Sequence, residues 1–317
     1  MNNLRKLTEN FNISGEASAA GSAVPGCELK KNEPLCAHTT FKVGGPAALF
    51  VVPETKEALV NFVKQCLSEK IRFFLIGGGS NIVPPDEGMN CAVVSTEKLD
   101  FIEYIESENM LWCGSGTPIK KVIEFCIANS LSGLESFAGL PGTAGGAVFM
   151  NARCYGFSIS DVLKKAEFFD CRSGSISEYE MNASDWDYKK SPFQNAERII
   201  TAAGFSVVKG DADSINEKCM SYIEDRRSKG HFSYPSAGSI FKNNRLFGKP
   251  SGMLIDEAGC RGMSCGGAKV ADWHGNFIIN TGNATAADIK KLISQVKEAV
   301  LKKDGFELEC EVIFPEP

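Results

Sequence analysis

Two glycine-rich segments constrain the fold of this chain more than any other feature. The first, Gly77-Gly78-Gly79-Ser80-Asn81, directly follows a short apolar stretch, 71–76, that we expect to be a strand. A glycine run lets successive backbone N–H groups converge on an anion, because no side chain blocks the approach. The segment therefore predicts a pyrophosphate-binding turn, with a plain tight turn as the alternative.

The second glycine-rich segment, 139–147, lies between a predicted helix that ends near Ser130 and the sequence 150–156. Two separated loops of this kind suit a dinucleotide better than a mononucleotide. The first loop is not the Rossmann fingerprint, because Ile82 stands where the third glycine would be and no helical pattern begins there.

Strand and helix patterns alternate along much of the chain. Thr55 can cap a helix whose apolar positions run from Leu59 to Leu67 with helical spacing, and Thr117-Pro118 opens a second helix with proline at its first position. Further on, the sequence predicts strands over 165–171 and 199–208 and a helix over 213–223.

The C-terminal pattern is the clearest. Thr285 and Asp288 resemble a capping box at the start of a helix that continues to Val300, although aspartate stands where glutamate or glutamine is usual. The segment 306–314 then alternates apolar and polar residues strictly, which predicts an amphipathic strand that closes the chain. By contrast, 14–26 is rich in small and polar residues, and we expect a flexible tether there after a short N-terminal helix.

Charge and hydropathy exclude several classes of protein. The formal net charge is −5, with basic and acidic residues interspersed, so no basic surface for nucleic acid is expected. No apolar run approaches the roughly 18 to 20 residues that a membrane span needs, and the N-terminus lacks the apolar core of a signal peptide. We therefore expect a cytoplasmic protein that binds neither nucleic acid nor membrane.

The 12 cysteines are spread singly, and no C-x-x-C pair occurs. In a chain long enough to build its own cores, they are expected to be small buried hydrophobic residues rather than disulfides. The closest pair, Cys260 and Cys265, has only His274 nearby, so we expect no metal site.

A third cluster of small residues surrounds a serine, from Tyr234 to Asn243, with Ser239 followed by Lys242. Ser239 lacks the G-x-S-x-G context of a triad nucleophile, and the chain contains only three histidines that could serve as its base. A serine in this position can still donate a proton or bind a phosphate, or it is simply a buried turn residue.

Together these segments resemble one family, the UDP-N-acetylenolpyruvoylglucosamine reductases of bacterial cell-wall synthesis. The resemblance extends from about residue 33 to the end of the chain. The matching segments are His38-Thr39-Thr40-Phe41-Lys42-Val43-Gly44-Gly45-Pro46, Gly77-Gly78-Gly79-Ser80-Asn81, Leu140-Pro141-Gly142-Thr143-Ala144-Gly145-Gly146-Ala147, Met150-Asn151-Ala152, 235–243, Leu254-Ile255-Asp256-Glu257-Ala258-Gly259 and the closing segment with Glu309.

The resemblance implies an α+β fold: a two-subdomain FAD-binding unit of the vanillyl-alcohol-oxidase/PCMH type and a C-terminal α+β substrate-binding domain. We place the N-terminal helix and tether at 1–32, the two FAD-binding subdomains at 33–98 and 99–209, and the substrate domain at 210–317. The resemblance further implies noncovalent FAD, NADPH as reductant, and reduction of the enolpyruvyl ether of UDP-N-acetylglucosamine enolpyruvate to UDP-N-acetylmuramate. We expect a monomer.

The resemblance also assigns catalytic residues. Ser239 matches the proton donor, and Glu309 matches the carboxyl group near the substrate carboxylate, although its place on a polar face is equally typical of a solvated side chain. Where the family usually has Tyr-Arg-x-Ser, this chain has Tyr188-Lys189-Lys190-Ser191, and lysine loses the bidentate fork of arginine. Arginine stands instead at position 153, where the family usually has glycine. Our hypothesis is that Arg153 and Lys189 compensate for each other; the alternative is that Arg153 points to solvent.

The remaining assignments concern binding. Lys242 and Asn243 are expected near the diphosphate or sugar, with Tyr155 and Tyr234 as further candidates. The short stretch between Arg226 and Ser239 resembles the subgroup that lacks a substrate-covering tyrosine loop. The residues expected to bind FAD are Gly77, Gly78, Gly79, Ser80, Asn81, Pro141, Gly142, Thr143, Gly145, Gly146 and Ala147.

Two other functions stay open at this stage. A different FAD-dependent oxidase or dehydrogenase would keep the glycine loops without requiring Ser239 and Glu309 in these contexts. A nucleotide-sugar-binding homologue with impaired catalysis would explain the missing arginine.

Overall fold

The computed structural model describes residues 24–195 and 197–317. Contacts within the chain divide it into two compact units. The first unit comprises the described part of Met1–Lys31 together with Leu49–Gly78 and Cys91–Asp225. The second comprises Asn32–Ala48, Gly79–Asn90 and Arg226–Pro317.

These units are not consecutive stretches of sequence, so they differ from the linear division at 98 and 209 that we expected. That division stays a prediction about functional domains. The expected N-terminal helix, and the expected tether as far as residue 23, lie outside the described residues.

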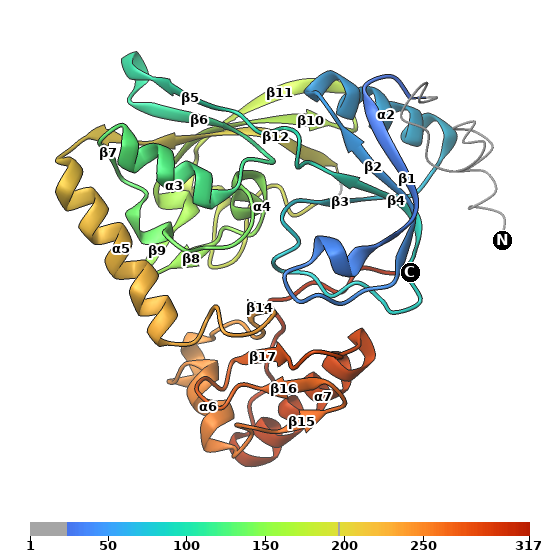
Figure 1. Ribbon diagram of the computed structural model, residues 1–317, viewed down its shortest axis with the longest axis vertical. Helices are drawn as coiled ribbons and strands as arrows, with labels where there is room; N and C mark the ends of the chain where they lie inside the picture. The colour runs from blue at the N-terminus through green and yellow to red at the C-terminus, as the bar shows by residue number, and fades with distance from the viewer. Residues whose placement is uncertain (1–23, 196) are drawn as a thin grey trace. The chain divides into compact units, whose positions relative to one another are not determined.

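An antiparallel five-stranded sheet forms the centre of the first unit, in the order β11-β10-β12-β6-β5. Figure 1 shows α3 (Ile119–Ala128) and α4 (Ala144–Phe149) on the same side of this sheet. Their apolar side chains, with those of the sheet, form the largest core of the unit. The strands are β5 (Ile102–Ile105), β6 (Met110–Gly114), β10 (Leu163–Asp170), β11 (Ser175–Glu180) and β12 (Arg198–Ser206).

A second sheet has the order β1-β2-β4-β3, and its strands β3 and β4 are parallel. Strands β1, β2 and β4 each include residues of both units. Two short hairpins complete the strands, β7 with β13 and β8 with β9. The bounds are β1 (Cys27–Pro34), β2 (Pro46–Pro53), β3 (Phe73–Ile76), β4 (Met89–Ser95), β7 (Leu131–Ser132), β8 (Arg153–Cys154), β9 (Phe157–Ser158) and β13 (Val208–Lys209).

The helices begin close to where the sequence predicts them. Thr55 caps α2 (Lys56–Glu69) by accepting a hydrogen bond from the backbone N–H of Ala58, as expected, although Leu67 is exposed rather than buried. Pro118 is the N-cap residue of α3 and not its first helical residue, so this helix begins one position later than expected. Helix α5 (Ala212–Ser228) begins before the expected Asp213, because the carboxylate of Asp211 already accepts from the N–H of Ser214.

The second unit contains a four-stranded sheet in the order β14-β17-β16-β15 and the helices α6 (Ser251–Glu257) and α7 (Ala286–Asp304), as Figure 1 shows. Apolar residues of both helices form one core with Ile240 and Ile278. The predicted capping box at Thr285 is confirmed, with Asp288 as its acidic member. The strands are β14 (Ser236–Ser239), β15 (Ser264–Cys265), β16 (Ala268–Val270) and β17 (Phe277–Asn280).

Polar contacts attach the two non-consecutive segments of the second unit to its C-terminal part. The hydroxyl of Thr40 donates to the carbonyl of Ser236 at 2.7 Å, and the side-chain amide of Asn280 donates to the carbonyl of Phe41 at 3.0 Å. The carboxylate of Asp86 accepts from the N–H groups of Ala286 and Ala287 at 2.7 and 2.9 Å, at the start of α7. A carboxylate is stabilised there by the positive end of the helix dipole.

The closing segment 306–314 is not a strand, so that prediction is wrong. Its alternation is real, since Leu308 and Val312 are buried while Glu307 and Glu309 are exposed. A strand, however, needs a continuous hydrogen-bonded ladder, and this segment divides its bonds between two partners. It forms one isolated bridge from Cys310 to Phe241 and another from Ile313 to Ile82.

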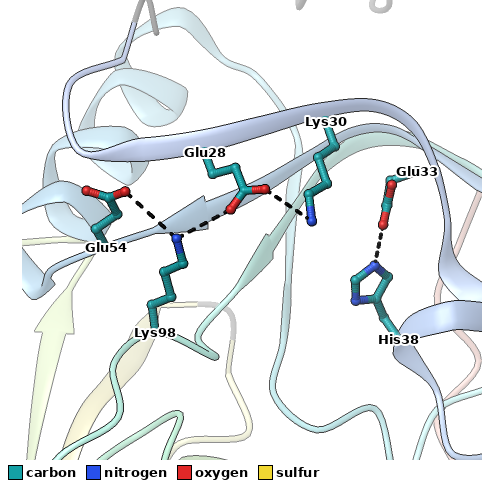
Figure 2. Close-up of polar contacts among 6 residues, drawn as sticks. All are labelled: Glu28, Lys30, Glu33, His38, Glu54 and Lys98. Carbon is teal, nitrogen blue, oxygen red and sulfur yellow. Dashed lines mark hydrogen bonds and ion pairs between the residues drawn. The ribbon is translucent and has the colours of Figure 1, made fainter. Parts of the chain in front are cut away.

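Ion pairs near the N-terminal strand are shown in Figure 2. In the first unit, Glu28 contacts Lys30 and Lys98, and Lys98 also lies 3.8 Å from Glu54. In the second unit, Nε2 of His38 lies 2.8 Å from Oε1 of Glu33. Exposed ion pairs such as those of Glu28 and Lys98 contribute roughly 0 to 1 kcal/mol each to the free energy of unfolding, so we assign them no role in a site.

Six short 3₁₀ helices connect these elements in the described part of the chain: η1 (Leu35–His38), η2 (Glu106–Glu108), η3 (Glu135–Phe137), η4 (Ile159–Asp161), η5 (Ala183–Asp185) and η6 (Arg245–Phe247). Among the residues described, no helix is long and apolar enough to cross a membrane. The 12 cysteines are all free, and eight of them are buried, as the sequence predicts. No three metal-ligating side chains come together within residues 24–195 and 197–317.

Candidate functional site

The two glycine-rich loops meet within the first unit. A Cβ atom added to Gly77 would lie 2.7 Å from Oγ1 of Thr143, and one added to Gly78 would lie 2.7 Å from Cα of Gly142. Both distances are too short for any side chain, so only glycine allows the loops to approach this closely. The predicted cofactor residues of these loops are therefore neighbours in space, although more than sixty positions separate them in the sequence.

The backbone of these loops is available to a ligand. Within the described chain, the N–H groups of Gly77, Gly78, Gly142 and Thr143 donate no hydrogen bond to another residue. The hydroxyl of Thr143 caps α4 by accepting from the N–H of Gly146. Free backbone donors that no side chain covers form a cradle for an anion. The residues present thus fit the pyrophosphate of a dinucleotide such as FAD.

Helix α4 supplies the other predicted cofactor residues. Gly145, Gly146 and Ala147 lie in its first turns, and the N–H of Gly145 donates to the carbonyl of Ser115 at 2.9 Å. A Cβ on Gly145 would lie 2.7 Å from that of Ser115, so this glycine is required by packing. Pro141 is exposed at the entrance to the loop.

The first loop continues into the second unit. Gly79 has a φ of +59°, and its carbonyl accepts from the N–H of Thr40 at 3.1 Å. Asn81, predicted to bind the cofactor with Ser80, donates its side-chain amide to the carbonyl of Glu311 at 3.0 Å. The N–H of Ile313 in turn donates to the carbonyl of Asn81 at 2.9 Å. At least part of the role of Asn81 is therefore to hold the closing segment.

Lys189 lies in a tight turn of the first unit. Asp187 and Lys190 form an isolated bridge, and Lys189 adopts a left-handed conformation with a φ of +59°. A residue with a side chain is uncommon in this region of backbone space, and such positions cluster at functional sites. This backbone conformation fits a functional role in which the fold fixes the direction of the Lys189 side chain.

Arg153 is exposed on the hairpin of β8 and β9, where its Nη1 donates to the hydroxyl of Ser158 at 3.0 Å. This bond uses one of the five guanidinium donors. Tyr155 on the same hairpin donates its hydroxyl to Asp225 at 2.8 Å, and its ring packs on Tyr222 with centroids 4.4 Å apart. Its predicted contact with substrate therefore competes with a structural contact to α5.

Ser239 ends β14, opposite Phe277 of β17, and the register between Ser236 and Ser239 is shifted. It is half-buried, and its hydroxyl makes no hydrogen bond within the described residues. The following residues are fixed by the buried Asn276, whose side chain bonds both the N–H and the carbonyl of Phe241 at 2.8 Å. Ser239 thus presents a free hydroxyl at the end of a held strand.

The structure brings two other predicted residues together. Nζ of Lys242 lies 2.6 Å from Oε1 of Glu309, and the backbone N–H of Lys242 donates to the carbonyl of Glu309. Asn243 uses its side-chain oxygen to accept from the N–H of Ser251, at the start of α6. The ring of Tyr234 stacks on Trp273 with centroids 6.0 Å apart and is 46% exposed.

Glu311, two positions after Glu309, is a candidate that the sequence did not single out. The side chain of Glu309 is 72% exposed, whereas Glu311 is half-buried. The backbone of Glu311 is held on both sides, because its N–H donates to Ile240 and its carbonyl accepts from Asn81. The signal that could have found it is the alternation itself, which places both carboxylates on one face.

Comparison with known proteins supplies further findings. Residues 47–179 match a family model described as an FAD binding domain. Residues 230–315 match the model described as UDP-N-acetylenolpyruvoylglucosamine reductase, C-terminal domain. The first match covers Gly77, Gly78 and the loop at Gly142, and the second covers Ser239, Lys242 and Glu309.

Curated relatives match nearly the whole chain. A UDP-N-acetylenolpyruvoylglucosamine reductase of Treponema denticola is 45% identical over 99% of this chain and 98% of its own length. The enzyme of the same name from Borreliella burgdorferi is 43% identical over 88% of this chain and 92% of its own. The crystal structure of the reductase from Thermus caldophilus matches with a TM-score of 0.76 and 29% identity, covering 91% of this chain and 98% of that one.

Proposed function

This chain belongs to the UDP-N-acetylenolpyruvoylglucosamine reductase family, and from that premise we propose that it reduces the enolpyruvyl ether of UDP-N-acetylglucosamine enolpyruvate to UDP-N-acetylmuramate, a precursor of peptidoglycan. The observation that carries the proposal is the meeting of two glycine loops with free N–H donors in a segment that matches an FAD binding domain. The reaction is that of an FAD-dependent oxidoreductase with NADPH as its reductant.

Gly77, Gly78, Gly142 and Thr143 would hold the pyrophosphate of noncovalently bound FAD. When bound, FAD would supply the hydride chemistry that links NADPH to the terminal vinyl carbon of the substrate. The protein must then stabilise the negative charge that develops on the neighbouring carbon and its carboxylate. A cation near this carboxylate and a proton donor near this carbon meet the two requirements.

Ser239 is the proposed proton donor. A serine hydroxyl is a very weak acid in water, so its competence depends on placement beside a strongly basic carbanion. The absence of a hydrogen-bond partner for its hydroxyl among the described residues supports this role, since the proton is not committed to a protein acceptor. Lys189 and Arg153 are the proposed cations, and Lys242 with Asn243 the proposed contacts to the diphosphate or sugar.

The carboxyl group near the substrate carboxylate is proposed to come from the closing segment. The resemblance points to Glu309, and the burial of Glu311 makes it a second candidate. We also propose that the protein acts as a cytoplasmic monomer, for which light scattering would give the chain mass of 34.3 kDa.

An anaerobic titration in two steps tests the function. The purified protein is expected to be yellow, to lose its colour on addition of NADPH, and to regain it on addition of UDP-N-acetylglucosamine enolpyruvate. Ser239→Ala should lose its colour at the wild-type rate but regain it about 100-fold or more slowly, because only proton donation is removed. A wild-type protein that is colourless and does not take up FAD, or that bleaches without regaining colour, would contradict the proposal.

A further inference from the structure

Asn151 occupies a backbone position that normally favours glycine. It follows Met150, the C-cap residue of α4, and has a φ of +41°. Its N–H donates to the carbonyl of Val148, and the N–H of Ala152 donates to the carbonyl of Ala147. These two bonds form a Schellman motif, in which the left-handed residue is usually glycine and less often asparagine. If backbone conformation alone decided the residue at position 151, glycine would therefore be more favourable than asparagine.

The side chain explains why asparagine stands there. Asn151 is only 3% exposed, and both ends of its amide are used. Nδ2 donates to the carbonyl of Asp187 at 2.9 Å, and Oδ1 accepts from the N–H of Ser160 at 3.1 Å. One buried amide thus joins the end of α4 to η4 and to the turn that begins at Asp187.

That turn carries Lys189 in its left-handed conformation. Two further bonds hold it: the hydroxyl of Ser191 donates to the carbonyl of Phe149 at 2.7 Å, and the side-chain amide of Gln194 donates to the carbonyl of Lys189 at 3.0 Å. A left-handed φ costs about 1 to 3 kcal/mol at a residue with a side chain and persists only where its surroundings enforce it. Asn151 provides the most buried of these restraints.

We propose that Asn151 is a positioning residue of the reaction: its buried amide fixes the Asp187–Lys190 turn so that the ammonium group of Lys189 is directed at the carboxylate of the substrate. The inference rests on the proposed function, in which Lys189 is a cation of the site. The three side-chain bonds that hold the turn all lie within one unit.

Asn151→Gly provides a sharp test, because glycine keeps the Schellman backbone and removes only the amide. We expect bleaching by NADPH and the content of FAD to stay at wild-type values, while the recovery of colour with substrate slows by about 10-fold to 100-fold. Asn182→Ala is the matched control, since Asn182 is exposed and, among the residues described, its side-chain oxygen accepts only from Ser184. The control should behave like the wild type.

A double variant separates positioning from a structural role. If Asn151 acts through Lys189, then Asn151→Gly should slow the recovery of colour in the wild type and have almost no further effect in Lys189→Ala. Gln194→Ala should have a smaller effect in the same direction. An unchanged recovery in Asn151→Gly, effects that add to those of Lys189→Ala, or a parallel loss of FAD would each overturn the inference. Failure of the wild type to regain colour would instead contradict the proposed function.

Discussion

At the scale of single residues, the closing segment offers two carboxylates that share a face but differ in surroundings. Glu309 is largely exposed, and its charge is already neutralised by Lys242 at 2.6 Å. Glu311 is half-buried and its backbone is fixed by Ile240 and Asn81. A group that interacts with a charge developing in the reaction is more effective where water is excluded and its position is fixed.

We therefore expect Glu311→Gln to slow the recovery of colour with substrate more than Glu309→Gln, by about tenfold or more. Glu309→Gln should mainly raise the KM for substrate, because the side chain of Lys242 then loses the carboxylate that holds it in place. Stopped-flow measurement of the two half-reactions gives both quantities. The reverse order, with Glu309→Gln the slower variant in the chemical step, would show that Glu309 is the carboxyl group near the substrate carboxylate.

The exchange of cations between positions 153 and 189 is a second prediction at this scale. Arg153 retains four guanidinium donors beyond its bond to Ser158, so it can offer the planar fork that Lys189 lacks. If both residues act as cations near the substrate carboxylate, Arg153→Ala and Lys189→Ala should each lower kcat for the substrate half-reaction by about tenfold or more. Arg153→Ala with wild-type turnover beside an inactive Lys189→Ala would contradict the exchange.

At the scale of elements, Asn81 links the loop at Gly79 to the closing segment. Its amide donates to Glu311, and its carbonyl accepts from Ile313. Asn81→Ala should leave the affinity for FAD unchanged, raise the KM for substrate, and lower the free energy of unfolding by about 1 kcal/mol, the usual contribution of one such bond. Flavin fluorescence measures the first quantity and urea unfolding the last. Asn90→Ala, a change at an exposed position of β4, is the control. A large loss of FAD affinity in Asn81→Ala would show that its side chain serves the cofactor instead.

Elements with local signals could be predicted from the sequence, and those with distant partners could not. The caps at Thr55 and Thr285 bond to residues three positions along the chain, so sequence spacing alone predicts α2 and α7. The closing segment has a strand-like alternation, yet its partners, Phe241 and Ile82, lie far away in the sequence and each pairs with only one position. The alternation within a segment predicts which of its side chains are buried. Whether it forms the hydrogen-bonded ladder of a sheet depends on a partner strand elsewhere in the chain, which the segment's own sequence does not specify.

At the scale of the whole molecule, the sequence predicted the glycine loops but not how the chain is divided. Gly77 and Gly78 belong to one compact unit and Gly79 to Asn81 to the other, so one short loop contributes to both. The close approach of the two loops explains these glycines, because a side chain at Gly77 would collide with Thr143 and one at Gly78 with Gly142. The division depends on contacts of Thr40 and Asp86 with the C-terminal part, which no local pattern predicts.

The buried thiols make the free energy of unfolding of the whole molecule depend on pH in the alkaline range. Burial raises the pKa of the Cys66 and Cys126 thiols from 9.0 to about 12, and that of Cys27 to about 11. A thiol is neutral when protonated, so a folded-state pKa above the unfolded value means that the stabilisation is fully present below pH 9. It is lost as the pH rises from 9 toward 12, because the unfolded chain ionises first.

Each such thiol should therefore lower the free energy of unfolding by about 1.4 kcal/mol between pH 8 and pH 10. Other groups titrate in the same range, so the test is a difference: in Cys126→Ala the decrease over this interval should be smaller than in the wild type by about that amount. Cys36→Ala, which removes a half-buried thiol, controls for the loss of one cysteine. Urea unfolding followed by circular dichroism at both pH values gives the four free energies for each comparison. Equal decreases in Cys126→Ala and in the wild type would mean that this thiol ionises as readily in the folded chain as in the unfolded one.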